Sequence, residues 1–374
     1  MTIKNSGNRG EWSEVYTFLK LLGDGKLYGA DAELNQREDI FYNIIEIIRC
    51  EEEGILHFEI DSTNSTIQLS NEANDISKSF AMELFSDEAK YLLEKIKESG
   101  TSSFEVVHTN EFMNGILCKK LKAPSQDKSD ITIKVHDFNT NLEPTLGFSI
   151  KSRLGKPSTL LNAGKTTNFI FEITGGFYEG EITSINDLIV EKDPDTVHED
   201  ISIKDRILYL KEESYSLVFS DMENKTFKNN LVLMDSDLPE ILANLLIQFY
   251  VQRKTKLTEA LAAIKITNPL RYDVSEGHDF YEYKIKKFLV ESALGMLPST
   301  VWTGKADANG GYIVVREDGE VLCYHLYNRN DFEDYLLNNT RFEQASTTRH
   351  DFGTVYKENG KYYIKLNLQI RFIK

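Results

Sequence analysis

The chain has 374 residues, of which 41% are hydrophobic and 27% charged, as expected for a globular protein with a sizeable core in one large domain or two ordinary ones. No apolar stretch reaches membrane-spanning length, and the N-terminus lacks the apolar core of a signal peptide. Three widely spaced cysteines argue against a disulfide scaffold and a cysteine-based zinc site, so we expect a protein of the reducing cytoplasm.

The net charge of −16 argues against loose binding to nucleic acid, because such a body repels a polyanion at long range. The charge is uneven, however, with acids concentrated at 51–53 and 193–200. Residues 119–165 contain nine basic and four acidic residues, and residues 340–374 contain seven basic and three acidic ones. Two interpretations stay open: a basic cleft that holds DNA within an acidic shell, or ordinary solvated lysines.

The first predicted helix covers residues 11–22. Ser13, Thr17 and Lys20 form a narrow polar face beside a broad apolar one. Glu14 lies outside the polar face, so its carboxylate should be partly buried and needs a partner. A metal ion or an active-site lysine would serve, and so would a salt bridge at the helix start, where a carboxylate also suits the helix dipole.

The remaining elements follow from apolar periodicity and from glycine, serine and proline signals. In the first half we predict, in chain order, a helix over 41–49, strands over 55–60 and 65–70, a helix over 86–98 capped by Ser86 and stopped by Gly100, strands over 129–136 and 146–153, a brief helix between Ser158 and Gly164, and a strand over 168–174. In the second half we predict helices over 238–251 and 281–294 and strands over 312–316, 321–325 and 362–372.

The strands over 129–136 and 146–153 carry the candidate chemistry. Apolar residues alternate with Asp130 in the first strand and with Ser149 and Lys151 in the second. If the strands pair, the Asp130 carboxylate and the Lys151 ammonium face a common cleft. A Mg²⁺-dependent phosphodiesterase needs this arrangement, because a hard oxygen ligand holds the metal and a nearby cation helps to orient and deprotonate the attacking water.

One metal ligand is missing from its usual place. The common nuclease pattern has an acid two residues before the lysine, and that position is Ser149, which we keep among the catalytic candidates. A second carboxylate must therefore come from elsewhere. The candidates are Glu14 and Glu172, since Glu172 is opposite in parity to its aromatic neighbours and can face a cleft. By itself the pattern is weak, because many strands carry a lysine at an edge.

Four segments resemble the HpaII family of type II restriction endonucleases. They are 8–22 (NRGEWSEVYTFLKLL), 146–163 (LGFSIKSRLGKPSTLLNA), 346–353 (STTRHDFG) and 365–374 (KLNLQIRFIK). The central run is the most specific of them. Because the segments lie at both ends and in the middle, the resemblance covers nearly the whole chain.

The resemblance implies an α/β fold with a PD-(D/E)xK restriction-endonuclease-like core, a mixed sheet flanked by helices. The change of pattern near residues 177–190 places this core at 1–185 and a helical and β-rich part, which completes the DNA-binding cleft and need not be a separate domain, at 186–374. The resemblance also implies Mg²⁺-dependent DNA hydrolysis at a CCGG-type site, with Asp130 as the metal-binding acid and Lys151 as the catalytic lysine. Other CCGG-cutting enzymes with a serine here carry the second acid further along, which supports Glu172. A helical Gly10-to-Glu14 spacing, found in related nuclease folds, supports Glu14, which we prefer.

Reading of the DNA sequence needs donors that reach guanine edges, usually Arg or Lys. Our candidates are Arg153, Lys156, Arg349 and His350, with Ser158 as a contact to a phosphate or a base. For each of them a phosphate clamp or a plain surface charge stays an equal alternative.

We therefore expect a bacterial cytoplasmic type II restriction endonuclease with Mg²⁺ as cofactor and double-stranded DNA as substrate. A cognate DNA methyltransferase would act on the same site without needing to bind the protein, and a homodimer stays open. A non-cleaving, sequence-specific DNA-binding protein is the first alternative, favoured by Ser149. A structure-specific repair or junction nuclease is the second.

Overall fold

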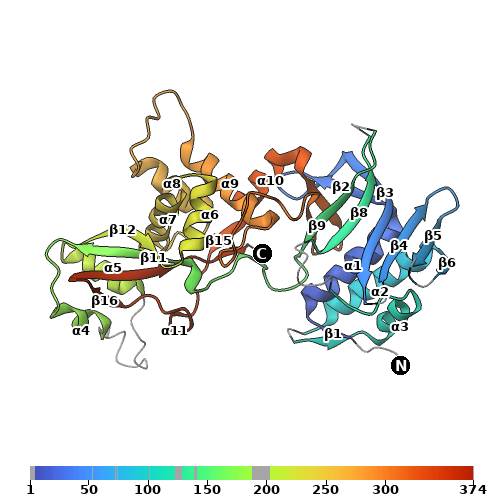
Figure 1. Cartoon of the computed structure of the whole chain (residues 1–374), viewed down its shortest axis with the longest axis horizontal. Coiled ribbons are helices and arrows are strands. Elements are labelled where there is room, and N and C mark those ends of the chain that lie inside the picture. The colour runs from blue at the N-terminus through green and yellow to red at the C-terminus, as the bar shows by residue number, and fades with distance from the viewer. Residues whose placement is uncertain are drawn as a thin grey trace.

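The computed structural model describes residues 5–373 except 53, 72, 74, 101, 123–128, 139–140 and 188–202. The acidic stretch at 193–200, and Lys128 of the basic stretch, therefore lie outside the described residues. The described chain forms two lobes that lie side by side (Figure 1). No helix in these described ranges is long and apolar enough to cross a membrane.

The first lobe is built on a nine-stranded sheet of order β2-β14-β13-β9-β8-β3-β4-β5-β6. Because β2 also pairs with β3, six of these strands (β2, β14, β13, β9, β8 and β3) close into a barrel, from which β4, β5 and β6 extend. The strands are β2 (Lys26–Ala30), β3 (Gln36–Glu51), β4 (Gly54–Asp61), β5 (Thr66–Asn71), β6 (Ile76–Ala81), β8 (Ile131–His136), β9 (Thr145–Ser152), β13 (Gly311–Val315) and β14 (Val321–His325).

Three helices and a short strand pair complete the described part of this lobe. They are α1 (Arg9–Asp24), α2 (Met82–Glu98), α3 (Val107–Gly115), β1 (Ser6–Gly7) and β7 (Phe104–Glu105). The predicted serine cap of the second helix is wrong, because α2 begins a turn earlier and Ala81 is its N-cap. Ser86 instead lies where α1 and α2 pack closely, since a Cβ at Gly23 would overlap it.

The predicted helix over 41–49 is also wrong, because this segment belongs to the long strand β3. It pairs with β2, β4 and β8, and its register shifts between Ile44 and Glu46. The extra residue of this bulge breaks the alternation of side chains. The buried positions therefore become Tyr42, Ile44 and Ile47, a spacing that also fits a helix.

The second lobe combines a four-stranded sheet of order β12-β11-β17-β16 with a three-stranded sheet of order β10-β18-β15. Its strands are β10 (Thr159–Leu161), β11 (Asn168–Thr174), β12 (Ser216–Met222), β15 (Thr340–Phe342), β16 (Val355–Glu358), β17 (Lys361–Asn367) and β18 (Ile370–Phe372). β10 replaces the brief helix predicted before Gly164, and the single strand predicted over 362–372 is two strands, β17 and β18.

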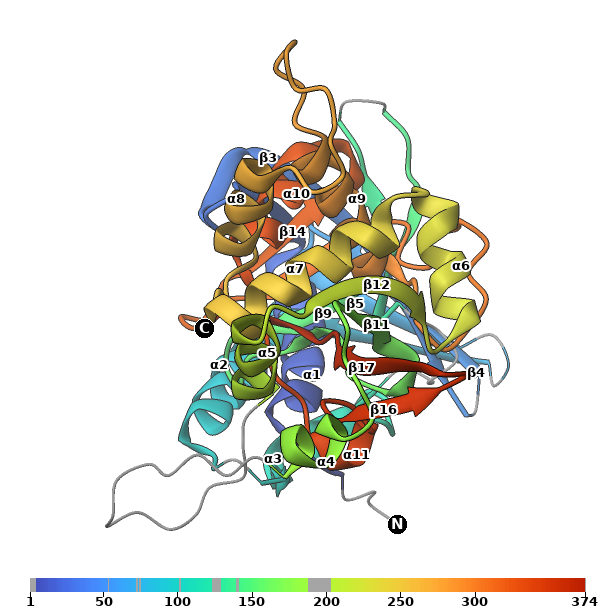
Figure 2. The same ribbon diagram turned by 90° about the vertical axis from the view of Figure 1, so that its left-hand side faces the viewer.

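The helices of this lobe are α4 (Glu181–Asn186), α5 (Ile203–Glu212), α6 (Lys225–Met234), α7 (Leu238–Gln252), α8 (Leu257–Thr267), α9 (Phe280–Leu294), α10 (Arg329–Asn338) and α11 (Thr347–His350), with short 3-10 turns η2 (Lys165–Thr167) and η3 (Leu326–Asn328). Figure 2 shows α7 lying along β12. The predicted helices over 238–251 and 281–294 are confirmed as α7 and α9.

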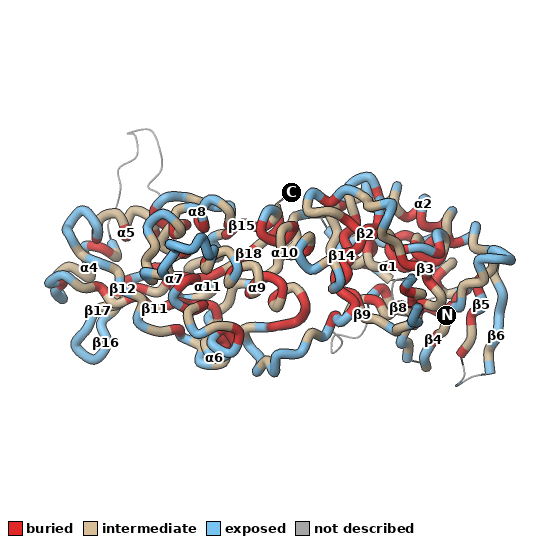
Figure 3. Tube along the Cα trace, turned by 90° about the horizontal axis from the view of Figure 1, so that it is seen from above, coloured by how far each residue is buried: buried red, intermediate tan, exposed pale blue. Residues whose placement is uncertain are grey.

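Buried segments gather in both lobes (Figure 3), and the β13–β14 hairpin contributes to both cores. Ile313 and Val315 point into the core of the first lobe, while Tyr312 and Val314 point into that of the second. Strands from the second half of the chain thus complete the first sheet, whereas β10 and β11, from the first half, belong to the second lobe. The mixed α/β architecture is confirmed, and the division at 185/186 into two domains stays a prediction.

Candidate active site

β8 and β9 are antiparallel neighbours, as predicted. The Asp130 N–H donates to the Phe148 carbonyl at 2.8 Å, which places Asp130 across from Ser149. Oδ2 of Asp130 accepts two hydrogen bonds, from the Ile150 N–H at 2.6 Å and from the Ser149 hydroxyl at 3.2 Å. The Asp130 carboxylate is therefore fixed against β9, beside the strand position that carries Lys151.

Glu14 comes to this site from the first turns of α1. The helix begins with a capping box, in which the Asn8 side chain accepts from the backbone of Glu11 and the Glu11 side chain accepts from the backbone of Asn8. This cap satisfies the orphan N–H groups of the first turn. It therefore fixes the start of the helix, so that Glu14 follows at a defined place.

Glu14 is half-buried, as predicted, and it makes no hydrogen bond or ion pair within the part of the chain that the structure describes. Its pKa is raised to about 7, first because burial disfavours the charged carboxylate and second because Asp130 adds a like charge. The charges of Lys122 and Lys151 act in the opposite direction. Glu14, Asp130 and Lys151 thus share one electrostatic environment, and we call them the cleft cluster.

Glu14 lies between two hollows. The smaller, of about 40 Å³, is lined by Glu14 and Asp130 together with apolar residues and with Arg49 and Thr132, mostly from β3 and β8. The larger, of about 540 Å³, opens beside Lys151. Its lining comes from the start of α1, the end of β9 and the linker between the lobes: Asn8, Arg9, Gly10, Glu14, Ile150, Lys151, Ser152, Gly155, Lys156, Pro157 and Ser158.

The cleft cluster fits a small, hard dication. Asp130 uses one oxygen toward β9 and keeps the other, and Glu14 has no hydrogen-bond partner among the described residues. Mg²⁺ is usually bound through one or two carboxylates, with water and substrate phosphate completing its shell. Across the residues that the structure describes, no group of three or more His, Cys, Asp or Glu side chains could hold a metal by itself. A two-carboxylate site agrees with both observations.

The prediction of Glu172 as a metal ligand at this site is wrong. Glu172 lies on β11 in the second lobe, where its carboxylate pairs with the Lys361 ammonium at 2.9 Å. The prediction that Glu172 lies on the opposite face of its strand from its aromatic neighbours is confirmed, since those neighbours are buried and Glu172 is not. The strand itself, however, belongs to a different sheet from β8 and β9.

The predicted DNA-binding residues of the central segment separate into two groups. Lys156 and Ser158 line the larger hollow together with Lys151, and Lys156 is exposed. Arg153 is turned elsewhere: it donates to the Asn339 side chain at 2.7 Å, and its guanidinium lies 5.8 Å from the centre of the Tyr335 ring. Arg153 therefore joins the end of β9 to α10. It does not line the larger hollow, but it lines a small neighbouring one together with Lys151 and Ser158.

Arg349 and His350 lie on α11, in the second lobe (Figure 1). The Asn168 side chain holds this segment by donating to the His350 carbonyl at 2.9 Å, and it donates to Glu223 at 2.7 Å. Arg349 is exposed on this anchored turn. The structure thus places both residues on the second lobe, and neither of them lines the larger hollow.

Sequence reasoning missed Arg9 and Lys122. Arg9 lines the larger hollow and bonds to the end of β9, and Lys122 acts on the charge of Glu14. Arg9 belongs to the first of the family-like segments, and this was the signal that could have singled it out.

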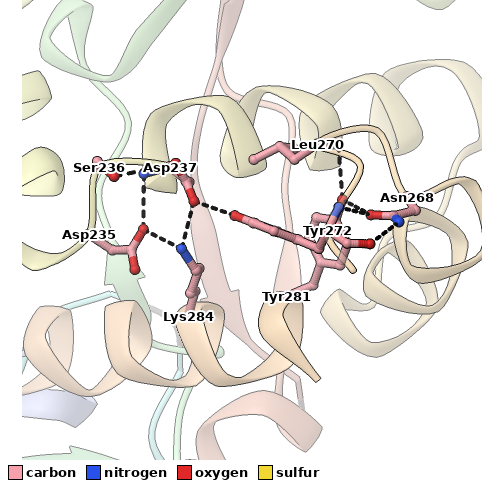
Figure 4. A network of polar contacts seen from close by, with 8 residues as sticks. All are labelled: Asp235, Ser236, Asp237, Asn268, Leu270, Tyr272, Tyr281 and Lys284. Carbon is pink, nitrogen blue, oxygen red and sulfur yellow. Dashed lines mark hydrogen bonds and ion pairs between the residues drawn. The ribbon is translucent and has the colours of Figure 1, made fainter. Parts of the chain in front are cut away.

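A second cluster with two acids and a lysine lies in the other lobe (Figure 4). Lys284 donates to Asp235 and to Asp237, both at 2.7 Å, and the Tyr272 hydroxyl donates to Asp237. The pKa of Asp237 is lowered, chiefly by the hydrogen bond from Lys284. We call these four residues the helix cluster. They connect α7 to α9 and to the loop between α8 and α9, so this cluster stabilises the lobe.

Two carboxylates and an uncommitted lysine beside a cleft are the parts of a metal-dependent nuclease. Comparison with known proteins agrees with this class. Residues 8–372 match the model of the HpaII restriction endonuclease family. The chain is 44% identical, over 376 aligned positions that span both proteins completely, to a protein of Haemophilus parainfluenzae named type II restriction enzyme HpaII.

The chain therefore belongs to the HpaII restriction endonuclease family. The resemblance expected from the four segments is confirmed, and so is the class of enzyme, a restriction endonuclease. No solved structure matches the chain.

Proposed function

We propose that the protein is a Mg²⁺-dependent type II site-specific deoxyribonuclease that hydrolyses double-stranded DNA at CCGG, with the cleft cluster as its catalytic centre. One observation carries the proposal. Glu14 is a half-buried carboxylate without a described partner, with its pKa raised to about 7, next to Asp130 and Lys151. A group that is costly to bury and left unpaired is typical of a functional site.

In this mechanism the residues of the chain do four things. Ser149 and the Ile150 N–H hold Asp130 so that its free oxygen faces the site, and Glu14 supplies the second carboxylate. Lys151 places a positive charge where the scissile phosphate and the attacking water meet, which orients the water and offsets developing negative charge. When bound, Mg²⁺ would supply Lewis acidity and lower the pKa of the water.

The finer fold assignment, a PD-(D/E)xK core, belongs to the same proposal. Its support is the pairing of β8 with β9, which sets Asp130 beside Lys151, and the packing of α1 against β9. Ser149 stands where the common pattern has an acid, and we assign that role to Glu14. The closed six-stranded barrel is an elaboration around this core.

We assign contacts with DNA to both lobes. Lys156 and Ser158 are placed to contact the backbone near the scissile phosphate, since they line the larger hollow. Arg349 and His350 would reach base edges from the second lobe. If Arg349 reads a guanine, Arg349→Ala should cost about 1–3 kcal/mol of discrimination at that base. A uniform loss of affinity across all sequences would mark Arg349 as a backbone contact.

We also propose a homodimer on DNA in the bacterial cytoplasm. Within the described residues we find one cleft cluster, and a dimer would supply a second, so that both strands of a symmetric site are cut in one binding event. Cys50, Cys118 and Cys323 are free thiols, which fits a reducing compartment. A cognate methyltransferase would modify the same site without binding this protein. Light scattering of the protein mixed with a CCGG duplex in Ca²⁺ would test the dimer, and a mass of one chain per duplex would contradict it.

Digestion of a plasmid in Mg²⁺ tests the proposal as a whole. Discrete fragments whose mapped ends all lie at CCGG would support it, and EDTA should abolish them. Binding without cutting would instead support the non-cleaving DNA-binding alternative. Nicking that follows DNA structure rather than sequence would support the repair alternative.

A further inference from the structure

We propose that a closed ring of hydrogen bonds through Ser13 and Ser152 locks α1 to the end of β9 and so sets how tightly the cleft cluster holds its dication. Both serines are positioning residues, since neither reaches the reacting atoms. The inference rests on the proposed function, because it concerns the metal site assigned there.

The direction of each bond in the ring follows from the chemistry of its atoms. Ser13 Oγ lies 2.6 Å from the Arg9 carbonyl, which can only accept, so the Ser13 hydroxyl donates to it. The Ser152 hydroxyl, at 2.8 Å, must then donate to Ser13 Oγ. Ser152 Oγ in turn accepts from the Leu154 N–H at 3.1 Å.

Arg9 closes the ring. Its Nη1 donates to the Leu154 carbonyl at 2.9 Å. Because the Leu154 N–H also donates to Ser152 Oγ, Leu154 connects Arg9 back to the two serines. Its Nε also donates to Ser99 Oγ at 3.1 Å, at the end of α2. Gly155 permits this approach, because a Cβ there would lie 3.3 Å from Arg9 Cβ. Three segments of the first lobe are thus tied together at one point.

The ring encloses the junction that the metal site depends on. Ser13 directly precedes Glu14, and Ser152 directly follows Lys151. Ser13 is fully buried and Thr17, one turn on, is fully buried as well, with its hydroxyl donating to the Ser13 carbonyl at 2.8 Å. The narrow polar face seen in the sequence therefore packs largely inside the protein. A slide of α1 along β9 would break these bonds without offering new ones.

Metal affinity should depend on this lock. Glu14 comes from a helix and Asp130 from a strand, so their separation is set by how the two elements are joined. Carboxylates that share a dication must hold their geometry to within about 0.5 Å. Loss of groups that orient metal ligands typically weakens metal affinity by about 10–100-fold.

The experiment measures Mn²⁺ binding to the full-length protein by electron paramagnetic resonance, without DNA and therefore without turnover. We expect Ser152→Ala and Ser13→Ala each to raise the Kd for Mn²⁺ by about tenfold. The double variant should have about the same Kd for Mn²⁺ as either single variant, because both changes break the same bond. Ser152→Thr, which keeps the hydroxyl, should bind Mn²⁺ like the wild type.

Ser292→Ala is the matched control. Ser292 is a buried serine of α9 whose hydroxyl donates to the Phe288 carbonyl at 2.8 Å, the same type of bond one turn back that Ser13 makes. Its loss should leave the Kd for Mn²⁺ unchanged. Thermal unfolding of every variant establishes that it is folded, and Ser152→Ala, at a half-buried position, keeps the test available if Ser13→Ala does not fold.

Glu14→Gln separates this inference from the proposed function. If Glu14→Gln loses Mn²⁺ while both serine variants bind it like the wild type, the metal site stands and the ring has no positioning role. Equal weakening by Ser292→Ala would also overturn the inference, because a general loss of stability would then explain the effect. A wild type that binds no Mn²⁺, or a Glu14→Gln variant that binds it normally, would remove the metal site itself.

Discussion

Two clusters in this molecule contain the same chemistry and use it in opposite ways. The cleft cluster and the helix cluster each bring together two carboxylates and one lysine. In the helix cluster, Lys284 bonds both acids and the pKa of Asp237 is lowered. In the cleft cluster, Lys151 and Glu14 make no such bond among the described residues, and the pKa of Glu14 is raised to about 7.

The difference shows that residue types alone do not separate a structural site from a functional one. An acid that is fully paired contributes to the stability of the fold, whereas a buried acid without a partner costs stability unless a ligand compensates. In the cleft cluster the missing partner fits a dication and a phosphate. In this comparison, the functional cluster is the one whose buried acid lacks a partner among the described residues.

Removal of the lysine from each cluster should give the largest difference between the two clusters. We expect Lys151→Ala to lower the rate of plasmid cleavage by about 10³-fold or more, because the cation beside the reacting phosphate is lost. Binding of a CCGG duplex in Ca²⁺ should persist. Lys284→Ala should instead lower the free energy of unfolding by about 2–3 kcal/mol, since it leaves two partly buried acids unpaired. Equal effects of both variants on cleavage by folded protein would refute the comparison.

Glu14→Gln should change how the free energy of unfolding depends on pH. In EDTA, the unfolded wild type ionises Glu14 above pH 4.5, while the folded protein keeps the proton until about pH 7. The free energy of unfolding of the wild type, relative to that of Glu14→Gln, should therefore fall by about 3 kcal/mol in total as the pH rises from 4.5 to 7. Above pH 7 the difference should stay constant. Denaturant unfolding at several pH values measures this difference.

In Mg²⁺ the same variant should lose cleavage. Glu172→Gln is the control. This variant should leave the cleavage rate unchanged, because Glu172 pairs with Lys361 in the second lobe. A constant difference in stability across the pH range would show that the Glu14 carboxylate is not strained by burial.

Ser149→Ala should have a smaller effect on the cleft cluster. Asp130 would lose the hydroxyl donor but keep the Ile150 N–H, so we expect cleavage to slow by about tenfold. Single-turnover rates at saturating Mg²⁺ measure this loss. A loss as large as that of Lys151→Ala would mean that the hydroxyl takes part in the chemistry directly.

Tyr272→Phe is the corresponding change in the helix cluster and the smallest one. It removes one hydroxyl donor from Asp237, which should cost about 1 kcal/mol in the free energy of unfolding and leave cleavage unchanged. Thermal unfolding and the plasmid assay provide the two readouts. A slower cleavage rate in the folded variant would show that the helix cluster is coupled to the active site.

The sequence predicted the parts of the site that depend on local patterns. The alternation around Asp130 and Lys151 correctly gave two paired strands, because side-chain parity is a local property. The helical wheel placed Glu14 at the edge of a buried face for the same reason. Both predictions concern neighbours along one element.

Features that depend on the assembly of elements were not visible in the sequence. The bulge in β3 made a strand resemble a helix, and Glu172 was correct in parity but lies in another sheet. Arg153 was judged by its charge, whereas its position beside Asn339 and Tyr335 follows from the joining of two lobes. Sequence spacing carries no information on such long-range contacts.

A crystal structure of the protein with a CCGG duplex and Ca²⁺ tests the central claim most directly. The account predicts one Ca²⁺ bound by oxygens of both Glu14 and Asp130, at about 2.3–2.6 Å, with the Lys151 ammonium next to the scissile phosphate. A cation held by other acids, with Glu14 left without a contact to it, would contradict the account.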